Sequence, residues 1–206
     1  PPDMHPVLDH YGYVELVLRA FGNRRHAAMS DRETNAIHAM LRMLIRLEDR
    51  LEREEPDVVL NIRDLHSSES GFAVPDRCAT AVDLHLPPSR SAAALAGELE
   101  SFASDALTAS RASRYEIEIP TLSDGFRLAP DDPWVRSLET ACRRLGYPWR
   151  PRPFKSHSDA NQLHEAGCAP VMLGPGSLAR AHTVDESIAF SEVVRAAELY
   201  TAILTT

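Results

Sequence analysis

The sequence predicts an α/β protein made of two structural parts, and three observations lead to this conclusion. Over residues 11–119, apolar patterns follow one another in the order strand, helix, strand, strand, helix, strand. That order is typical of a ferredoxin-like βαββαβ unit, an antiparallel sheet with two helices on one face. Over residues 120–206, helical stripes alternate with a short apolar run, as in part of a mostly parallel α/β domain. With 206 residues, 44% of them hydrophobic, the chain is large enough for a packed core.

The ferredoxin-like unit is predicted to begin with a strand at residues 11–20 (YGYVELVLRA), where apolar and polar side chains alternate. Ser30 and Glu33 then have the spacing of a capping box and precede a helix that Pro56 ends. The apolar stripe of this helix is Ile37, Met40, Leu41, Leu44, Leu47 and Leu51.

Two more strands and a second helix complete the unit. Residues 58–65 and 78–86 have the composition and alternation of strands. The apolar residues of the next helix recur at helical spacing: Leu95, Leu99, Phe102 and Ala106. Residues 115–119 (YEIEI) alternate again and are predicted to be the last strand.

The second part is expected to contain three helices and one buried strand. Asp132 has the position of an N-cap before Pro133, and Gly146 that of the residue after the helix end. Ser158 or Asp159 is expected to cap a short helix that ends near Gly167. Residues 170–173 (PVML) are expected to form a buried strand, and residues 191–204 the final helix. These strands are too few for a complete doubly wound domain.

The composition excludes several classes of protein. The net charge is −8 and no basic block offsets it, which argues against a nucleic-acid partner. No apolar run approaches the length of a membrane span. The three cysteines, Cys78, Cys142 and Cys168, are far apart and form no CxxC pair, so buried, reduced thiols in a cytoplasmic protein are expected.

Most of the nine histidines have no neighbour that suggests a function. A solvated surface position is the expectation for five of them: His5, His10, His38, His66 and His164. His26 differs because it lies in the turn between the first strand and its helix, where a loop can present a side chain to another molecule. From the residues alone, a purely structural role for His26 remains the simpler interpretation.

The segment around Ser158 allows two interpretations. Hydroxyls, an imidazole and a carboxylate gather at a predicted helix start, where a substrate carboxylate could dock. Plain helix capping by Ser158 or Asp159 explains the same residues equally well. A Ser-His-Asp triad is disfavoured, because adjacent residues rarely achieve its geometry and the chain has no GxSxG motif.

His182 has the most informative context. It follows the Gly/Pro-rich loop at residues 174–176 and precedes the last helical run, a setting suited to a metal ligand or an acid/base group. Asp185 and Glu186 come just after it and could orient the imidazole or cap the helix behind it.

Three segments together resemble a known enzyme family. They are PVLDHYGYVELVLRAFGNRRHAA (residues 6–28), VPDRCATAVDLHLPP (74–88) and SHSDANQLHEAGCAPVMLGPGSLARAHTVDE (156–186). In this order they are similar to the zinc-dependent family of aminoacylase, acetylornithine deacetylase, succinyl-diaminopimelate desuccinylase and carboxypeptidase G. The third segment is the most specific, with its Ser-Asp pair, its Gly-Pro-Gly and its His-Thr-x-Asp-Glu.

The resemblance implies roles for individual residues. His182 matches a histidine that binds one of two zinc ions, and Co²⁺ or Mn²⁺ are possible substitutes. His26 matches a histidine that reaches the active site of the partner subunit and stabilises the oxyanion. Ser158 and Gly176 match positions near the carboxylate of the substrate. The ferredoxin-like unit matches the lid domain, through which a homodimer is expected to form.

The chain also departs from the family pattern. Phe72 stands where the family often has asparagine, and His157 stands where glycine is common. His85 occupies the place of a frequent arginine and is the candidate to replace it in binding the substrate. The His-x-Asp motif, the bridging aspartate and the Glu-Glu pair that precede the lid in this family have no counterpart in residues 1–10.

The resemblance therefore implies three segments. Residues 1–10 are the end of a catalytic-domain segment, residues 11–119 the lid, and residues 120–206 the C-terminal part of the catalytic domain. Such a chain is expected to be the C-terminal part of a dinuclear zinc amidohydrolase that acts on N-acyl amino acids or small peptides, and to lack activity alone. The alternative is a non-catalytic module for dimerisation or small-molecule binding.

Overall fold

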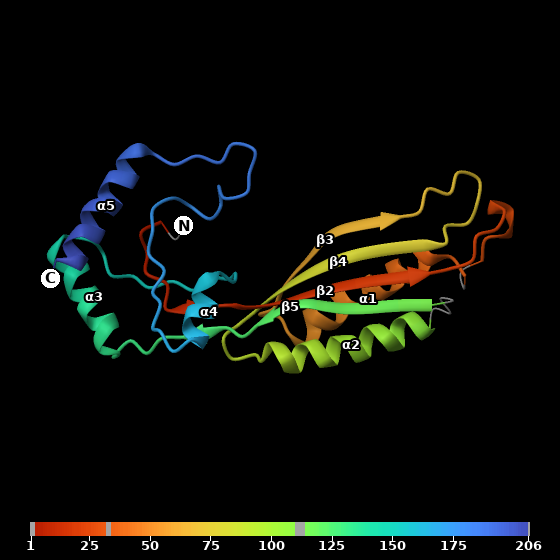
Figure 1. Cartoon of the computed structure of the whole chain (residues 1–206), viewed down its shortest axis with the longest axis horizontal. Helices are drawn as coiled ribbons and strands as arrows, with labels where there is room; N and C mark the ends of the chain where they lie inside the picture. The colour runs from red at the N-terminus through yellow and green to blue at the C-terminus, as the bar shows by residue number, and fades with distance from the viewer. Residues whose placement is uncertain (1–2, 32–33, 110–113, 206) are drawn as a thin grey trace. The chain divides into compact units, whose positions relative to one another are not determined.

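The structure is a computed structural model that describes residues 3–31, 34–109 and 114–205 (Figure 1). The chain divides into two compact units. One unit is Gly12–Asp124, and the other combines Pro1–Tyr11 with Gly125–Thr206. The predicted α/β fold class is confirmed, since both units mix helices and strands.

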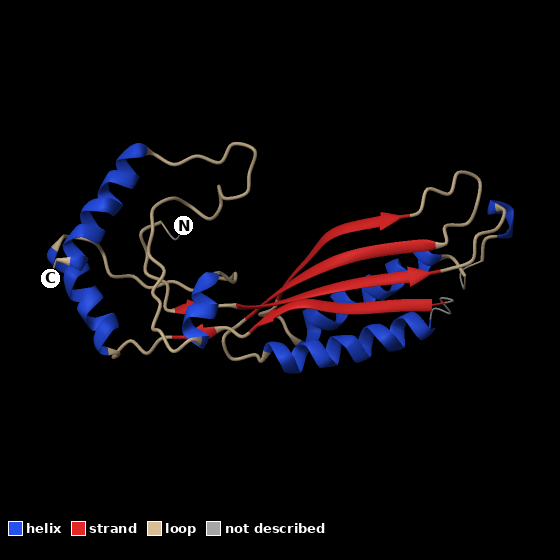
Figure 2. Ribbon diagram, viewed as in Figure 1, coloured by secondary structure: helices blue, strands red, loops and turns tan. Residues whose placement is uncertain are grey.

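The unit formed by Gly12–Asp124 is a four-stranded antiparallel sheet with two helices on the same side of it (Figure 2). The strand order across the sheet is β3-β4-β2-β5, so β3 and β5 are the edge strands. Its elements in chain order are β2 (Gly12–Phe21), α1 (Ala36–Glu54), β3 (Val59–Ser67), β4 (Arg77–Leu86), α2 (Ala92–Ala109) and β5 (Arg114–Ser123). This is the βαββαβ order that the sequence predicts, with one short 3-10 helix, η1 (Ala27–Met29), added after β2.

The core of this unit follows from the alternation in its strands. Val14, Leu16, Leu18 and Ala20 of β2 are all fully buried, because they face the two helices. Met40, Met43 and Leu47 of α1 and Leu95 and Leu99 of α2 meet them and are themselves at most 1% exposed. Burial of one such leucine contributes roughly 1.5–3 kcal/mol.

The start of α1 differs from the prediction. Asn35 is the N-cap, and its side chain accepts hydrogen bonds from the backbone N–H groups of Ile37 and His38. Asp31 turns the chain before that point by accepting from both the N–H and the hydroxyl of Thr34. Ser30 is therefore not the N-cap of the helix, and Glu33 of the expected capping box lies outside the described residues.

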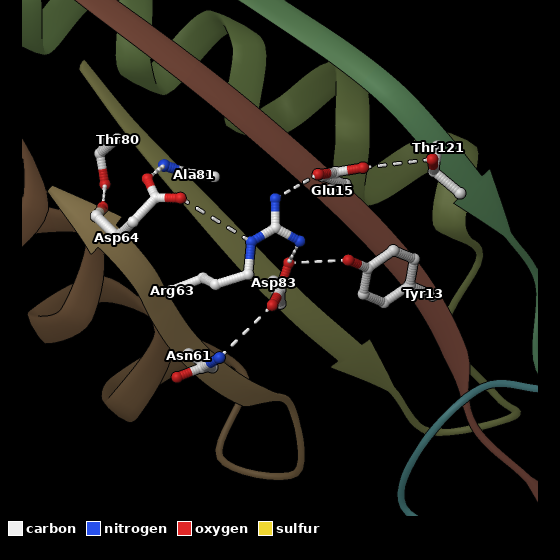
Figure 3. Close-up of polar contacts among 9 residues, drawn as sticks. All are labelled: Tyr13, Glu15, Asn61, Arg63, Asp64, Thr80, Ala81, Asp83 and Thr121. Carbon is white, nitrogen blue, oxygen red and sulfur yellow. Dashed lines mark hydrogen bonds and ion pairs between the residues drawn. The ribbon is translucent and has the colours of Figure 1, made fainter. Parts of the chain in front are cut away.

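The face of the sheet away from the helices carries a polar network that crosses all four strands (Figure 3). Asp83 of β4 accepts hydrogen bonds from the Tyr13 hydroxyl at 2.7 Å and from Arg63 at 3.2 Å. Arg63 also donates to Glu15 at 2.6 Å, and Thr121 of β5 donates to the same carboxylate at 3.2 Å. Burial and the bond to Asp83 raise the pKa of Tyr13 far above its usual value.

This network lies beside the two irregularities of the sheet. The register shifts between Glu15 and Val17 where β2 meets β5, and between Ile62 and Asp64 where β3 meets β4. A bulge leaves one residue outside the ladder and weakens the definition of register. Cross-strand side-chain bonds at the same positions restore that definition.

The other unit contains a two-stranded antiparallel ribbon and three helices. Its elements are β1 (Asp9–His10), β6 (Phe126–Arg127), α3 (Pro133–Arg144), α4 (Asp159–Glu165) and α5 (Phe190–Leu204). Asp132 caps α3 by accepting from the N–H groups of Trp134 and Val135, and Ser158 caps α4, as the sequence predicts. No helix of the described residues is long and apolar enough to cross a membrane.

The strand expected at residues 170–173 is not formed. Met172 makes only a single antiparallel bridge, to Val7. Proline has no N–H to donate to a ladder, and Pro6, Pro170 and Pro175 lie on both sides of this bridge. The segment is therefore held by isolated bonds, among them one from the N–H of Met4 to the carbonyl of Gly174 at 2.8 Å.

Candidate active site

His182 lies in the irregular segment between Gly176 and α5. Its backbone is left-handed, with φ 59°, a conformation that few residues other than glycine adopt. The carboxylate of Glu186 holds this turn by accepting the backbone N–H of His182 at 3.0 Å. The side chain of His182 is exposed. The imidazole of His182 is therefore exposed, and its backbone is held by the hydrogen bond to Glu186.

Glu186 acts differently from both sequence expectations. It binds the backbone of His182 rather than the ring. It does not cap the final helix either, because α5 begins at Phe190 after Ala189, which makes no side-chain cap bond. The helix-capping alternative for this acidic pair is therefore wrong, since the N-cap position of α5, Ala189, lies three residues beyond Glu186.

Gly176 requires glycine for its backbone shape. Its φ is 84°, in the region that a Cβ disfavours, and the residue is buried. Its N–H donates to Glu192 in the first turn of α5 at 3.2 Å, and its carbonyl accepts the N–H of Asp3 at 2.9 Å. A cavity of about 310 Å³ opens beside it, lined by Pro175, Gly176, Ser177, Arg180, Ala181, Glu186, Ser187 and Ile188.

Ser158 occupies the N-cap of α4 and is bonded on several sides. Its Oγ accepts the N–H of Ala160 at 3.2 Å, and its own N–H donates to the Asn161 side chain at 2.9 Å. The Asn161 amide in turn donates to the carbonyl of Tyr11 at 3.0 Å. The capping interpretation of this segment is confirmed, and the hydroxyl also lies 2.8 Å from Nε2 of His10.

His10 lies in a different environment from the one that the sequence predicts. It was expected on the solvated surface, but it is fully buried. Its ring stacks on Phe126, with centroids 5.0 Å apart, and lies against Phe154 at 5.1 Å. Burial, aided by repulsion from His157, lowers the pKa of His10 from 6.5 to about 4. Residues 10–14 are all buried, so no alternation of buried and exposed side chains marks His10 in the sequence.

The other four histidines of that group divide between interior and surface. His164 is half-buried and stacks on Phe126 at 4.3 Å, so its expected solvated position is also wrong. His5 is half-buried and its Nδ1 lies 3.1 Å from the carbonyl of Arg150. His38 and His66 are exposed, as expected.

His26 stands at the tip of the sheet unit, just before η1. Its Nδ1 accepts the N–H of Ala28 at 3.1 Å, which places the proton of the neutral ring on Nε2. The loop is tied to the β3–β4 connection by bonds from Ala27 to Phe72 at 2.8 Å and from Val74 to Arg25 at 2.7 Å. The side chain is exposed. The loop thus displays a donor N–H on a fixed backbone.

His85 is not close to His26. It lies on β4 opposite Tyr13, and the two rings are 5.5 Å apart at a tilt of 44°. Tyr13 is near the start of β2, whereas His26 follows its end. Eight residues of strand between Tyr13 and Phe21 span about 26 Å, so one small ligand cannot bridge the two histidines within this unit.

A metal ion needs several ligand side chains that converge on one point. In residues 3–31, 34–109 and 114–205, no group of three His, Cys, Asp or Glu side chains converges in a way that could hold one. A zinc ion takes three or four protein ligands. The described residues therefore do not form a complete metal site by themselves, and the ligand role of His182 stays a prediction.

Comparisons with known proteins agree on one family. A model of peptidase family M20/M25/M40 matches residues 20–206. An acetylornithine deacetylase from Vibrio cholerae is 27% identical over 204 residues, which cover 92% of this chain and 51% of that protein. The chain thus spans about half the length of the curated relatives it matches.

Two solved structures have the same fold. A tripeptidase from Staphylococcus aureus superimposes with a TM-score of 0.80 at 16% identity, over 98% of this chain and 53% of that one. The aminopeptidase PepT from Bacillus cereus gives a TM-score of 0.71 at 18% identity, over 98% of this chain and 54% of that one.

Proposed function

The chain belongs to peptidase family M20/M25/M40, and from this membership we propose that it is the C-terminal part of a hydrolase of amide bonds. The substrate class is N-acyl amino acids or small peptides. The family match over residues 20–206 is the observation that carries the proposal. Two similar proteins are named as a deacetylase and a tripeptidase, and both names imply cleavage of an amide bond.

The intact subunit is proposed to use two Zn²⁺ ions, with Co²⁺ or Mn²⁺ as substitutes, and His182 as a ligand of one of them. An exposed imidazole on a fixed left-handed turn suits this part, since its position is set before the metal arrives. When bound, such ions polarise a carbonyl and lower the pKa of water. The other ligands and the general base are proposed to lie outside these 206 residues.

His26 is proposed to stabilise the oxyanion in the active site of the partner subunit. The hydrogen bond that Nδ1 accepts from Ala28 supports this role, because it leaves Nε2–H to donate outward. One donor of this type contributes about 2.7–4 kcal/mol to the stability of a transition state. The neutral ring suffices, so the role does not require a protonated histidine.

Ser158 and Gly176 are proposed to bind the carboxylate of the substrate. The hydroxyl of Ser158 is half-buried and fixed by His10 and Ala160, which suits a group that orients a ligand. His85 remains a proposed substrate contact in place of the family arginine. Its position on the open face of the sheet, away from His26, restricts that contact to a separate part of the ligand or of the assembly.

A homodimer through the sheet unit is the proposed assembly. The edge strand β3 exposes Val59, Ile62 and Leu65, which are 38–43% exposed. Leu41 and Ile45 of α1 are 41% and 57% exposed. An edge strand offers backbone groups for hydrogen bonding and, here, exposed apolar side chains. A second copy of the chain can bond to the former and cover the latter.

The function is tested in the intact enzyme with a panel of N-acetyl amino acids and di- and tripeptides. We expect hydrolysis that a chelator abolishes and Zn²⁺ restores, with about two zinc ions per subunit. His182→Ala is expected to remove about one zinc ion and most of the activity. The matched control is His66→Ala, which removes an exposed histidine of β3 and is expected to keep both zinc ions.

The opposite results would refute the proposal. They are an intact enzyme that hydrolyses none of these substrates, or a His182→Ala variant with unchanged zinc content. The 206-residue chain alone is expected to show no hydrolysis. The alternative is a non-catalytic module for dimerisation or small-molecule binding, which the complete core of the unit Gly12–Asp124 supports. Such a module would bind no zinc when its metal content is measured.

A further inference from the structure

The contact between His10 and Ser158 joins residues 148 positions apart, at 2.8 Å between Nε2 and Oγ. The ring of His10 cannot turn away from this contact. Phe126 stacks on it at 5.0 Å with only 9° between the planes, and Phe154 lies against it at 5.1 Å. The ring is fully buried. The position of the imidazole is therefore set by packing, independently of any ligand.

The surroundings of the ring indicate where its proton lies. Within the described residues, Nδ1 of His10 is buried and has no hydrogen-bond partner. A proton on Nδ1 would create a buried N–H without an acceptor, which is rarer in proteins than an unsatisfied acceptor. The neutral ring therefore carries its proton on Nε2 and donates it to Oγ of Ser158. Burial keeps the ring neutral, since it lowers the pKa of His10 to about 4.

The hydroxyl of Ser158 is thereby limited to one role. A serine oxygen has two acceptor sites and one proton. His10 Nε2–H occupies one acceptor site and the N–H of Ala160, at 3.2 Å, occupies the other. The proton of the hydroxyl is what remains for a ligand. Asn161 fixes the same residue further by accepting its backbone N–H at 2.9 Å.

We propose that His10 is a positioning residue that makes the Ser158 hydroxyl an obligatory donor, so that this position binds a carboxylate and rejects an ammonium group. An ammonium group has only donors and cannot pair with a hydroxyl whose acceptor sites are filled. The inference rests on the proposed function, in which Ser158 contacts the substrate. It deepens that function by naming the buried residue through which the Ser158 hydroxyl selects a carboxylate.

The first test is the tautomer of His10, observed by ¹⁵N NMR of the intact enzyme labelled in histidine. We expect the pattern of a neutral ring protonated on Nε2 at pH 7, and its loss in His10→Gln. A ring protonated on Nδ1, or a charged ring at pH 7, would overturn the proposal. This measurement needs no substrate, so it decides the point even if the enzyme hydrolyses none of the compounds tested for the proposed function.

The second test compares a carboxylate ligand with its neutral analogue, N-acetyl-L-alanine and N-acetyl-L-alaninamide. His10→Leu removes the donor and fills the same space, whereas His10→Gln can place an amide N–H near the position of Nε2. We expect His10→Leu to raise KM, or Kd where there is no turnover, about tenfold for the carboxylate but under twofold for the carboxamide. His10→Gln should restore most of the difference, and kcat should change little.

His164→Leu is the matched control, because His164 stacks on the same Phe126 and none of its described bonds reaches Ser158. It is expected to lower thermal stability as His10→Leu does, without altering the preference for the carboxylate. Equal loss of both ligands in His10→Leu, or the same change of preference in His164→Leu, would show a merely structural role. Adding His10→Leu to Ser158→Ala should have no further effect on the carboxylate.

Discussion

His10 is fully buried and His182 is exposed, and the difference follows from what surrounds each ring. His182 is held outward by a left-handed turn that Glu186 fixes through the backbone. His10 is enclosed by two phenylalanines that lie 116 and 144 residues further along the chain. The first ring is available to an external partner. The second can act only through the residue that it contacts, Ser158.

Sequence reasoning could identify His182 but not His10, for a physical reason. The neighbours that define His182 are adjacent in the chain, in the Gly-Pro-Gly loop and the acidic pair. The burial of His10 comes from Phe126 and Phe154, which no local pattern connects to it. The Nδ1 bond of His26 to Ala28 was likewise invisible, although the turn that presents His26 was predicted.

The buried His10 predicts a dependence of stability on pH. Its pKa is lowered from 6.5 to about 4 in the folded chain, so the unfolded chain takes up a proton first as the pH falls. The stability that neutral His10 provides is complete above pH 6.5 and is lost as the pH falls towards 4. The total loss is roughly 3 kcal/mol for a shift of this size.

Urea unfolding of wild type and His10→Gln between pH 7 and pH 4 measures this effect. Trp134 and Trp149, the two tryptophans of the chain, both lie in the unit that contains His10 and report its unfolding. We expect the difference in unfolding free energy between the two proteins to shrink as the pH falls. A difference that stays constant over this range would contradict the assignment.

Among the elements, the presence of each helix was easier to predict than its first and last residues. Short strands were also harder to predict than helices. The stripe at Met40, Leu44 and Leu47 gives α1 correctly, because it needs only local periodicity. The helix starts at Ala36 rather than after Ser30 because Asp31 and Thr34 form a turn of their own. The apolar run at residues 170–173 could not become a strand, since prolines interrupt the ladder that it would join.

The turn after β2 depends on Gly22, which predicts the effect of a single methyl group. A Cβ at Gly22 would lie 2.1 Å from the carbonyl oxygen of Thr34 and 2.9 Å from the N of Ala36, both backbone atoms. The chain segments around Gly22 and Thr34 must then move apart, which lowers the free energy of unfolding by about 1–3 kcal/mol. The loop that carries His26 begins at this contact, so Gly22→Ala is expected to loosen it as well.

Gly97 is the matched control for this prediction. It lies in α2, and a Cβ there would meet nothing within 4 Å. Gly97→Ala should therefore raise stability, by up to about 1 kcal/mol, because alanine favours the helix. Thermal melting by circular dichroism and hydrogen exchange of residues 22–31 give the two readouts. A Gly22→Ala protein as stable as Gly97→Ala would disprove the close contact.

For the molecule as a whole, the proposed dimer makes each active site depend on two chains. The order of strands and helices was enough to predict the ferredoxin-like unit, although β3 and β4 are the only described strands of its sheet that are both consecutive and paired. The exposure of Leu41, which belongs to the predicted apolar stripe of α1, and of Ile62 could not be predicted in the same way. An outward apolar residue continues the same periodicity as a buried one, so only the packed structure separates them.

Subunit complementation tests the shared site. His26→Ala and His182→Ala variants of the intact enzyme are each expected to be nearly inactive. After the two are mixed and allowed to exchange subunits, half of the dimers are hybrids with one complete site. Activity should then return to about one quarter of the wild-type value.

The control is the His26→Ala variant taken alone through the same exchange procedure, and it should stay inactive. If His26 acted within its own chain, every hybrid site would lack one residue or the other, and mixing would restore nothing. Sedimentation of Ile45→Glu, which places a charge on the exposed face of α1, should show dissociation if that face belongs to the interface.

The short ribbon of β1 and β6 has a consequence for engineering. His10 pairs with Phe126 and Tyr13 pairs with Ser123, so the chain departs for the sheet and comes back through neighbouring positions about 5 Å apart. Splicing out everything between these pairs would leave two ends that a tight hairpin of a few residues can join. Removal of the intervening segment in one piece would leave a smaller chain that keeps only the ribbon, α3, α4 and α5.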